Sequence, residues 1–228
     1  VSSIGVLFGT MAMVIVLSVF NGFDDIIDNL YKNVDSDFKL ELREGNLFDV
    51  DNEFIQRINN IDGVSHCAEV LEYKMLAQYL NNQLVVEVKG VDENYPNVNS
   101  LKHSILLGNY FNNRENFAIV GNGIFHKLSL KLLDFETPLK LSFFKETSVL
   151  NLNNSIQNRR FYVSGVFVTK VELDDTHVLL RIDDLRDFLS LSRKCSSIEV
   201  KIKESTNHKI IEEKLENIFG NQFLIKNR

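Results

Sequence analysis

The first 23 residues of the chain form one apolar run without a charged side chain, and Asp24 and Asp25 follow it directly. A helix rises ~1.5 Å per residue, so a helix of this length reaches roughly 35 Å, enough to cross a bilayer core of about 30 Å. We therefore expect residues 1–33 to form a membrane helix with a short extension outside the membrane. Residues 34–228 are expected to fold as a domain on one side of it.

Two other kinds of segment are apolar at this position. A signal peptide begins with basic residues and has a shorter apolar core and a small-residue cleavage site, whereas the first basic residue here is Lys32. A core helix of a soluble protein rarely runs beyond about 14 residues without a charge. Both alternatives fit less well than a membrane span. Because the chain begins at Val1 rather than Met, we expect it to be a fragment of a longer protein.

The helix is expected to continue past the membrane as an amphipathic segment. Apolar residues recur there at spacings of three and four, while Asp24, Asp25 and Asp28 occupy the opposite face. The apolar stripe consists of Phe23, Ile26, Ile27, Leu30 and Tyr31. Such a rigid extension would couple motion in the membrane to the domain outside it.

The composition of the whole chain is that of an ordinary globular protein. Its hydrophobic fraction of 44% is enough for a real core. Its net charge of −6 argues against a nucleic-acid partner, because binding phosphates requires a clustered basic surface. We expect residues 34–228 to form one large domain, in two lobes.

Alternating apolar residues and turn signals predict an α+β fold, with helices packed on a mostly antiparallel sheet. Helices are predicted after the capping residue Asp51, at Gly121-Asn122-Gly123, from Asp183 or Asp184 to Leu191, and from Thr206 to Gly220. Strands are predicted at 37–43, 64–80, 83–91, 117–120, 139–144, 160–169, 178–182, 197–202 and 222–225.

No catalytic, cofactor-binding or metal-binding motif is visible. The segment Gly121-Asn122-Gly123 lacks the further glycine and the Gly-Lys-Ser/Thr of a phosphate-binding loop, so a helix-start turn is favoured. The pair Asp174-Asp175 could be a metal site or a solvated turn, and we favour the turn. Cys67 and Cys195 could form a disulfide, but two separate buried thiols are favoured because each lies in an apolar, strand-like run.

Four segments in order carry a resemblance to a known family. The run that holds SIG at 3–5 and VLSVFNGF at 16–23 resembles the first transmembrane helix of the lipoprotein-releasing (Lol-type) ABC transporter permeases, in the broader FtsX/MacB-like permease family. Three later segments resemble that family in turn: KGVD at 89–92 followed by LG at 107–108, AIVGNG from 118 through the helix to 130, and FYVSGVF at 161–167 with the acidic turn after it.

The resemblance spans nearly the whole chain, with two departures. Residues 130–133 lack the Gly-Asp that usually ends the short helix, and Lys170 stands where a small residue is common. Both lie in turns, so they bear on local geometry rather than on the family.

The resemblance implies a permease subunit in the bacterial inner membrane, with a MacB-type core domain in the periplasm between its first two membrane helices. A separate cytoplasmic ATPase would bind ATP and Mg, leaving no cofactor in this chain. A second permease subunit would complete a homo- or heterodimer. The complex would extrude a lipoprotein from the membrane, in contact with membrane lipid, and pass it to a periplasmic carrier protein.

Two sets of site residues follow from this reading. Residues 144–160 stand where carrier-recruiting family members have a protruding hairpin, here called the hook. Its predicted carrier-binding residues are Val149, Leu150, Leu152, Ile156, Arg159 and Arg160; the alternative is a loop that folds back and buries its own apolar side chains. In the membrane helix, Gly5, Gly9 and Phe20 are candidates for helix packing and acyl-chain contact, although Phe20 could simply touch lipid.

Two other functions remain open from the sequence. A MacB/FtsX-like efflux or mechanotransmission permease would share the fold but lack a carrier-binding hook. A membrane-anchored periplasmic sensor or binding module belongs to a different class and would have only one or two membrane spans.

Overall fold

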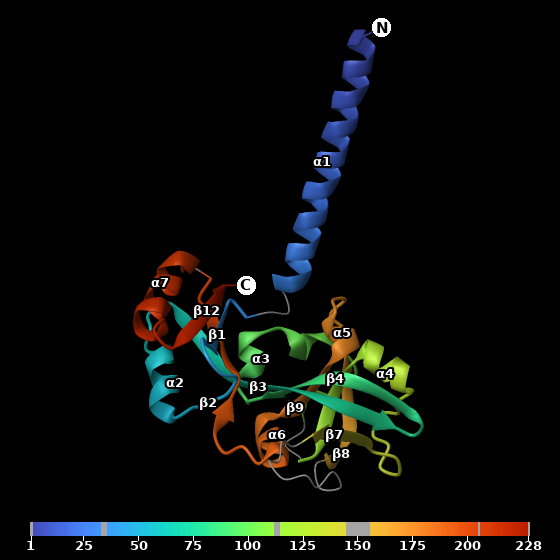
Figure 1. Ribbon diagram of the computed structural model, residues 1–228, viewed down its shortest axis with the longest axis vertical. Coiled ribbons are helices and arrows are strands. Elements are labelled where there is room, and N and C mark those ends of the chain that lie inside the picture. The colour runs from blue at the N-terminus through green and yellow to red at the C-terminus, as the bar shows by residue number, and fades with distance from the viewer. Residues whose placement is uncertain (1, 33–35, 112–114, 145–155, 205, 228) are drawn as a thin grey trace.

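The computed structural model describes residues 2–32, 36–111, 115–144, 156–204 and 206–227 (Figure 1). Within these ranges the elements are α1 (Ser2–Lys32), β1 (Phe38–Leu42), β2 (Phe48–Asp49), α2 (Asn52–Asn59), β3 (Val64–Tyr79), β4 (Asn82–Val91), α3 (Tyr95–Val98), the 3-10 helix η1 (Leu101–Ser104), β5 (Ile105–Gly108), β6 (Phe117–Gly121), α4 (Asn122–Leu128), β7 (Leu139–Phe144), β8 (Ile156–Phe167), α5 (Leu173–Thr176), β9 (His177–Arg181), α6 (Ile182–Leu189), β10 (Lys194–Cys195), β11 (Ser197–Ile202), α7 (His208–Phe219) and β12 (Phe223–Asn227).

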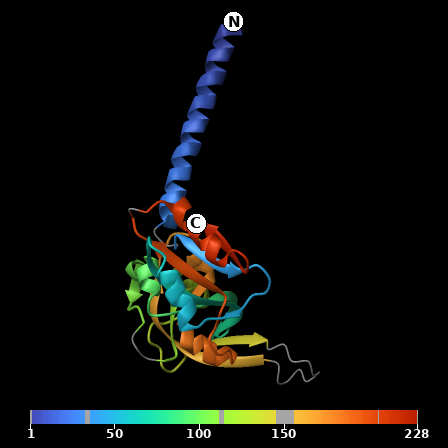
Figure 2. The same ribbon diagram turned by 90° about the vertical axis from the view of Figure 1, so that its left-hand side faces the viewer.

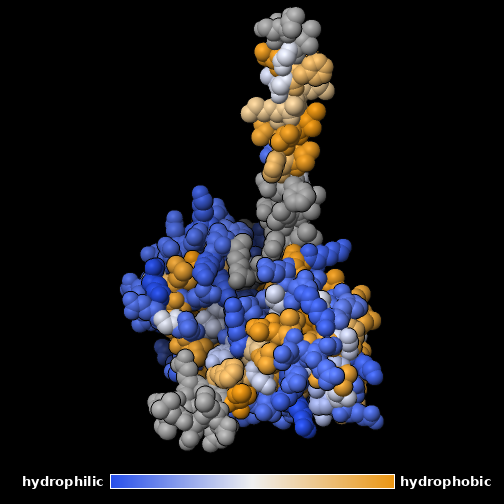
Figure 3. All heavy atoms as spheres, turned by 45° about the vertical axis from the view of Figure 1, so that its right-hand side comes forward, coloured by the Kyte–Doolittle hydropathy of each residue, from blue (hydrophilic) through white to orange (hydrophobic). Residues whose placement is uncertain are grey.

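Helix α1 projects away from the folded domain (Figures 1 and 2). Its stretch Gly5–Gly22 is long and apolar enough to cross a membrane, and none of it is buried against the domain. Figure 3 shows apolar side chains around this part of α1 and a largely hydrophilic domain surface below it. The predicted N-terminal helix is confirmed. The amphipathic stripe predicted over 23–31 concerns side chains outside the described part of the structure.

Six strands of the domain close into a ring. Strand β3 pairs with β4, β4 with β9, β9 with β6, β6 with β8, β8 with β7, and β7 returns to β3. The pairs β4–β9 and β6–β8 are parallel and the other four are antiparallel. The α+β fold with a mostly antiparallel sheet is thereby confirmed. Closing a sheet on itself leaves fewer exposed strand edges.

Apolar side chains of the ring strands pack with those of helices α4 and α6. Residues such as Leu71 of β3, Leu141 of β7 and Phe161 of β8 are fully buried. The helices contribute Ile124, Leu128, Leu185 and Phe188 to the same cluster. Successive side chains of a strand point to opposite faces, so every second one points inward. The resulting alternation of apolar and polar residues predicts these strands from the sequence.

Strand β3 runs on beyond the ring into a second region of the same sheet. Its first half pairs with β11, and β1 lies between β11 and β12. Helices α2 and α7 cover this sheet and share an apolar cluster with it. That cluster includes Phe38, Leu40, Ile58, Ile211 and Leu215. A smaller cluster beneath α3 packs Tyr95 and Val98 against Phe167 and Leu179.

A row of charged side chains crosses the sheet beside α3; Lys39, Glu72, Lys89 and Glu199 are here called the charge ladder. The Lys39 and Glu72 side chains lie 3.0 Å apart, Glu72 and Lys89 3.5 Å, and Lys89 and Glu199 2.7 Å. The ring of Tyr95 covers the Lys89 ammonium at 5.1 Å. Burial alone would lower the pKa of Lys89, but Glu199, Tyr95 and Glu72 together outweigh it and hold that pKa well above its usual range.

The first residues of α2, α7 and α6 test the predicted helix caps, of which one is confirmed and two are wrong. The Asp51 side chain accepts a hydrogen bond from the backbone N–H of Phe54, as predicted. The helix predicted to start at Thr206 is instead capped by Asn207, whose side chain accepts from the N–H of Lys209. Neither Asp183 nor Asp184 is a cap, because α6 begins directly after β9 and both lie in its first turn.

The segment Gly121-Asn122-Gly123 and the acidic pair Asp174-Asp175 contact each other. A Cβ on Gly121 would lie 2.3 Å from the carbonyl oxygen of Asp174, so only glycine fits where β6 passes into α4. The Asp174 carboxylate accepts hydrogen bonds from the backbone N–H groups of Thr169 and Lys170, and Asp175 pairs with Lys127 at 2.8 Å. The predicted helix start is confirmed, whereas Asp174 and Asp175 lie in the one-turn helix α5 rather than in a turn.

The two cysteines are free and buried, as favoured from the sequence. Burial raises the pKa of Cys67 to about 12, and burial likewise raises the pKa of Cys195. Both therefore act as small apolar core residues, Cys67 beside α2 and Cys195 within β10.

The two departures from the family pattern share a backbone conformation that favours glycine. Leu133 has a φ of 52° and Lys170 a φ of 64°. Left-handed φ values are unfavourable for side chains with a Cβ, and most so for bulky ones. The chain thus keeps the turn geometry without the small residues that normally suit it.

Candidate partner-binding surface

Strands β7 and β8 form a hairpin that extends from the ring at the end of the domain remote from α1 (Figure 2). Only their inner halves are embedded in the sheet. Strand β7 pairs with β3 at residues 140–142, and β8 joins β6 from Tyr162 onward. The outer part, up to Phe144 and Ile156, is paired only within the hairpin among the described residues.

One face of the hairpin is fixed to the domain by aromatic rings. Phe143 of β7 meets Phe188 of α6 edge-on, with ring centroids 5.1 Å apart, and Phe161 of β8 lies 6.1 Å from the same ring. The ring of Tyr73 of β3 also meets that of Phe143 edge-on, with centroids 5.6 Å apart. This anchoring holds the hairpin in one orientation.

The opposite face carries three cross-strand pairs, here called the outward strip. At the outer end of the described strands, Phe144 lies opposite Ile156, and the two side chains are 71% and 50% exposed. Next come the buried Ser142 and the exposed Asn158, and nearest the ring the half-buried Lys140 lies opposite the exposed Arg160. The strip thus passes from apolar through polar to basic over six residues.

The basic pair is unusual because like charges directly opposite each other destabilise a sheet. Among the described residues, neither Lys140 nor Arg160 has a carboxylate within ion-pair distance, and Arg160 is exposed. Two cations without a described carboxylate partner, beside the exposed Phe144 and Ile156, are complementary to an apolar partner surface with an acidic rim.

The neighbouring Arg159 has a different environment. It donates from Nε to Asn116 Oδ1 at 2.8 Å and from Nη1 to Asp187 Oδ2 at 2.6 Å. It also lies 5.9 Å from the Phe161 ring. In the structure, Arg159 therefore faces the domain while Arg160 faces outward.

The other predicted site residues fall in three groups. Val149, Leu150 and Leu152 lie outside the described residues, as does the rest of the hook tip. Ile156 lies on the outward strip. Gly5, Gly9 and Phe20 are exposed on α1, and a Cβ at either glycine would meet nothing within 4 Å.

Sequence reasoning missed Phe144 and Lys140 as site residues. Both belong to β7, which the alternation predicted as an ordinary strand. Their pairing with Ile156 and Arg160 depends on the register of the hairpin, and that register becomes visible only once both strands are placed.

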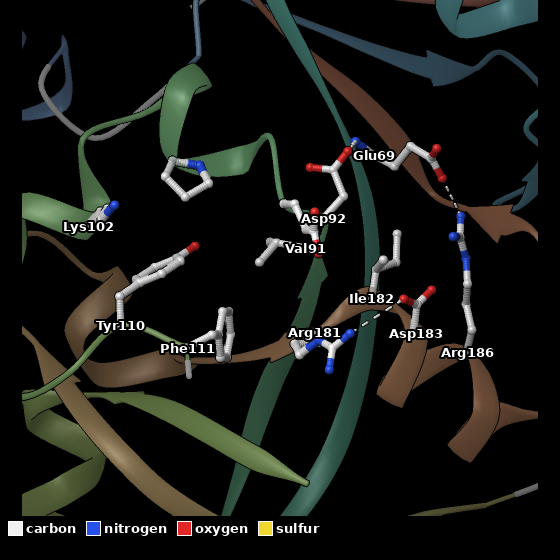
Figure 4. A pocket seen from close by; sticks show the side chains of 12 residues that line it. Glu69, Val91, Asp92, Lys102, Tyr110, Phe111, Arg181, Ile182, Asp183 and Arg186 are labelled. Atoms are coloured by element: carbon white, nitrogen blue, oxygen red, sulfur yellow. Dashed lines mark hydrogen bonds and ion pairs between the residues drawn. The ribbon is translucent and has the colours of Figure 1, made fainter. Parts of the chain in front are cut away.

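A separate cavity of about 460 Å³ opens where the parallel strands β4 and β9 end (Figure 4). Tyr110 and Phe111 line one side and Arg181 the other. The residues that line the cavity come from separate parts of the chain between Glu69 and Arg186, so no contiguous sequence motif indicates it.

The charges around this cavity are largely used by the fold. Arg186 pairs with Glu69 at 2.6 Å, and Arg181 lies 3.8 Å from Asp183. Asp92 accepts hydrogen bonds from the backbone N–H groups of Glu69, Asn94 and Tyr95. Burial raises the pKa of Asp92 to about 6 against these hydrogen bonds, and the Glu69 carboxylate adds to the rise. The carboxylate thus holds the turn that leads into α3.

The fold and the helix define a class of protein. Residues 1–218 match the family described as "MacB-like periplasmic core domain", so the chain belongs to this family. The lipoprotein-releasing system transmembrane protein LolC of Buchnera aphidicola subsp. Acyrthosiphon pisum is 25% identical over 198 residues, which cover 84% of this chain and 47% of that protein. LolC from the Schizaphis graminum subspecies is 22% identical over 217 residues, which cover 89% of this chain and 50% of that protein.

The chain thus spans about half the length of these curated relatives. Among solved structures, the periplasmic region of MacB from Actinobacillus actinomycetemcomitans superposes with a TM-score of 0.59 at 14% identity, covering 86% of this chain and 90% of that one. The extracellular domain of the ABC-type transporter YknZ from Gram-positive bacteria gives 0.55 at 16% identity, covering 83% and 99%. The chain is therefore a periplasmic domain of the ABC transporter permease type, preceded by an apolar helix.

Proposed function

We propose that the chain is the first membrane helix and the periplasmic domain of a permease subunit that releases lipoproteins from the inner membrane and passes them to a periplasmic carrier protein. The single observation that carries this proposal is the outward strip. Its exposed Phe144 and Ile156 and its pair Lys140 and Arg160, which has no carboxylate partner among the described residues, suit a soluble protein partner with an apolar pocket and an acidic rim.

The position of the strip supports the same function. The hairpin lies at the end of the domain opposite α1, so a partner that approached it would come from the periplasm (Figures 1 and 2). The similarity to LolC, a lipoprotein-releasing system protein, favours a lipoprotein as the cargo. The carrier is the expected recipient because acylated proteins do not cross water unaided.

In this proposal α1 forms part of the transport path. Its exposed Gly5 and Gly9 would pack against a helix of the same or a second permease subunit, and Phe20 would contact acyl chains. A separate cytoplasmic ATPase would bind ATP and Mg and drive the cycle. The domain would then transmit the motion of the membrane helices to the carrier.

Site-specific photo-crosslinking in the full-length permease tests the proposal. A photoreactive residue replaces Phe144 or Ile156 in one set of cells and the exposed Leu224 of β12 in a matched control. We expect ultraviolet light to join the carrier to the hairpin positions and not to position 224. Absence of the carrier from both hairpin adducts, with expression and membrane insertion intact, would contradict the carrier-binding role. Capture there of another envelope protein would favour an efflux-type permease.

A further inference from the structure

A second exposed apolar group lies beside the base of the hairpin. Phe135, in the loop between α4 and β7, is 60% exposed, and its ring lies 5.1 Å from that of Tyr162 on β8. Tyr162 in turn lies 5.9 Å from Phe117 of β6. Leu133 of the same loop is 45% exposed, so these side chains form a group, and contiguous exposed apolar groups mark interaction sites more often than single exposed side chains do.

The loop that presents Phe135 is held rigidly. Asp134 accepts a hydrogen bond from the Tyr79 hydroxyl at 2.8 Å and two more from the backbone N–H groups of Glu136 and Thr137. The Leu133 N–H donates to the Val163 carbonyl oxygen at 2.8 Å. Phe135 is thus fixed between two anchored neighbours, and a preordered side chain loses little entropy on binding.

The same loop holds a strained, exposed leucine. Leu133 has a φ of 52°, although glycine or asparagine would fit that conformation without strain. Backbone strain combined with exposed apolar side chains in a rigid loop is more typical of binding surfaces than of connecting loops.

Phe135 also continues the outward strip. Side chains two residues apart on a strand share a face, so Ile156, Asn158, Arg160 and Tyr162 all lie along one side of β8. From Ile156 to Tyr162 this row is about 20 Å long at ~3.3 Å per residue. The aromatic group therefore lies next to the basic pair, at the end of the strip remote from the tip.

We propose that Phe135, supported by Tyr162 and Leu133, is a second anchor for the same carrier protein that contacts Phe144 and Ile156. The inference rests on the proposed function. The carrier would contact an apolar anchor at each end of the strip and place acidic groups against Lys140 and Arg160 between them. An arrangement with apolar anchors around a charged centre fixes both the position and the orientation of the bound protein.

The test measures carrier binding to the full-length permease, reconstituted with its partner subunits in nanodiscs, with the purified carrier of the same organism as the probe. We expect Phe135→Ala to raise the Kd roughly tenfold, as expected for an aromatic anchor, and Phe135→Tyr to keep the wild-type value. The matched control is Ile210→Ala on α7, which removes a side chain of similar exposure, 50%, and should leave the Kd unchanged.

The outcomes separate this inference from the proposed function. If Phe144→Ser weakens carrier binding while Phe135→Ala does not, the second anchor is wrong and the proposed function stands. If the wild-type permease binds no carrier, both are wrong. If Phe135→Ala instead abolishes a contact between copies of the permease, measured as a change in particle mass, or its attachment to lipid vesicles, the second anchor is also overturned.

A further measurement guards against a folding defect. An aromatic photoreactive residue at position 135, which keeps a ring beside Tyr162, should capture the carrier, while the same residue at 210 should not. Failure of position 135 to capture a carrier that position 144 does capture would overturn the second anchor.

Discussion

The charge ladder and the outward strip use charged residues in opposite ways. In the ladder, two lysines and two glutamates lie on four neighbouring strands, and each side chain contacts an opposite charge within 3.5 Å. In the strip, Lys140 and Arg160 face each other across a strand pair with no carboxylate in reach among the described residues. The charges of the ladder are paired within the fold, whereas those of the strip would be paired only by a binding partner.

The charges of the ladder stabilise the domain, whereas those of the strip are available to a partner. A buried charge left alone is expensive, so each ladder residue depends on its neighbours. An exposed pair of like charges costs only a little stability and leaves its electrostatic attraction available for binding. Substitutions in the two regions should therefore have opposite consequences for stability and for binding.

The largest effect is expected in the ladder. Lys89→Met leaves Glu199, which is 1% exposed, without its cation, and should lower the free energy of unfolding by about 3–5 kcal/mol. Denaturant unfolding of the chain in detergent measures it. The double variant Lys89→Met with Glu199→Leu should recover much of the loss, because an apolar pair leaves no charge unpaired. A single variant as stable as the wild type would show that the ladder is not coupled in this way.

A second test of the ladder uses pH. Burial alone would raise the pKa of Glu72, but Lys89 and Lys39 outweigh it and lower that pKa to about 2. Because the folded pKa lies below the unfolded value of about 4.3, the stabilisation is present above that pH and is lost as the pH falls toward 2. Glu72→Gln should flatten the dependence of the unfolding free energy on pH over this window. An unchanged slope would contradict the assignment.

A smaller effect of opposite sign is expected beside the strip. Leu133→Gly relieves the left-handed strain and should raise the free energy of unfolding by about 0.5–1 kcal/mol. The same variant should weaken carrier binding, because it removes an exposed apolar side chain of the second anchor. Lys170→Gly is the control: it relieves similar strain at a φ of 64° in a different turn and should leave carrier binding unchanged.

The smallest change in stability is expected within the strip itself. Arg160→Glu converts a like-charge pair into an opposite-charge pair with Lys140 and should stabilise the domain by about 0.2–1 kcal/mol. Carrier binding should weaken at the same time and lose part of its salt dependence. Lys209→Glu on α7 makes the same reversal of sign elsewhere on the surface and should not affect binding. A loss of stability without a change in binding would place Arg160 in the fold rather than in the interface.

Much of the fold was predictable because alternation and turn chemistry are local. The strands at 117–120 and 197–202 were found within one residue of their observed bounds, and Asp51 caps its helix as predicted. Local signals failed where a neighbour decided the outcome. Asn207 rather than Thr206 caps α7, and β8 begins at Ile156 rather than residue 160, because its polar first residues pair with β7.

The candidate site was only partly visible for the same reason. The hairpin could be placed from the sequence, and Ile156 and Arg160 were named. Neither the closure of the ring by β7 against β3 nor the register that sets Lys140 opposite Arg160 can be read from either strand alone. Arg159 and Arg160 look identical in the sequence, and only their alternation on a placed strand separates the one that faces the domain from the one that faces outward.

Strand β3 also has a consequence for how the domain unfolds. Its 16 residues supply side chains to all three apolar clusters and pair with β11, β4 and β7 in turn. Neither sheet region can come apart without releasing this shared strand, so the domain should lose its structure in one cooperative transition. Amide protons along β3 should then exchange with solvent only through global opening, at a rate set by the stability of the entire domain.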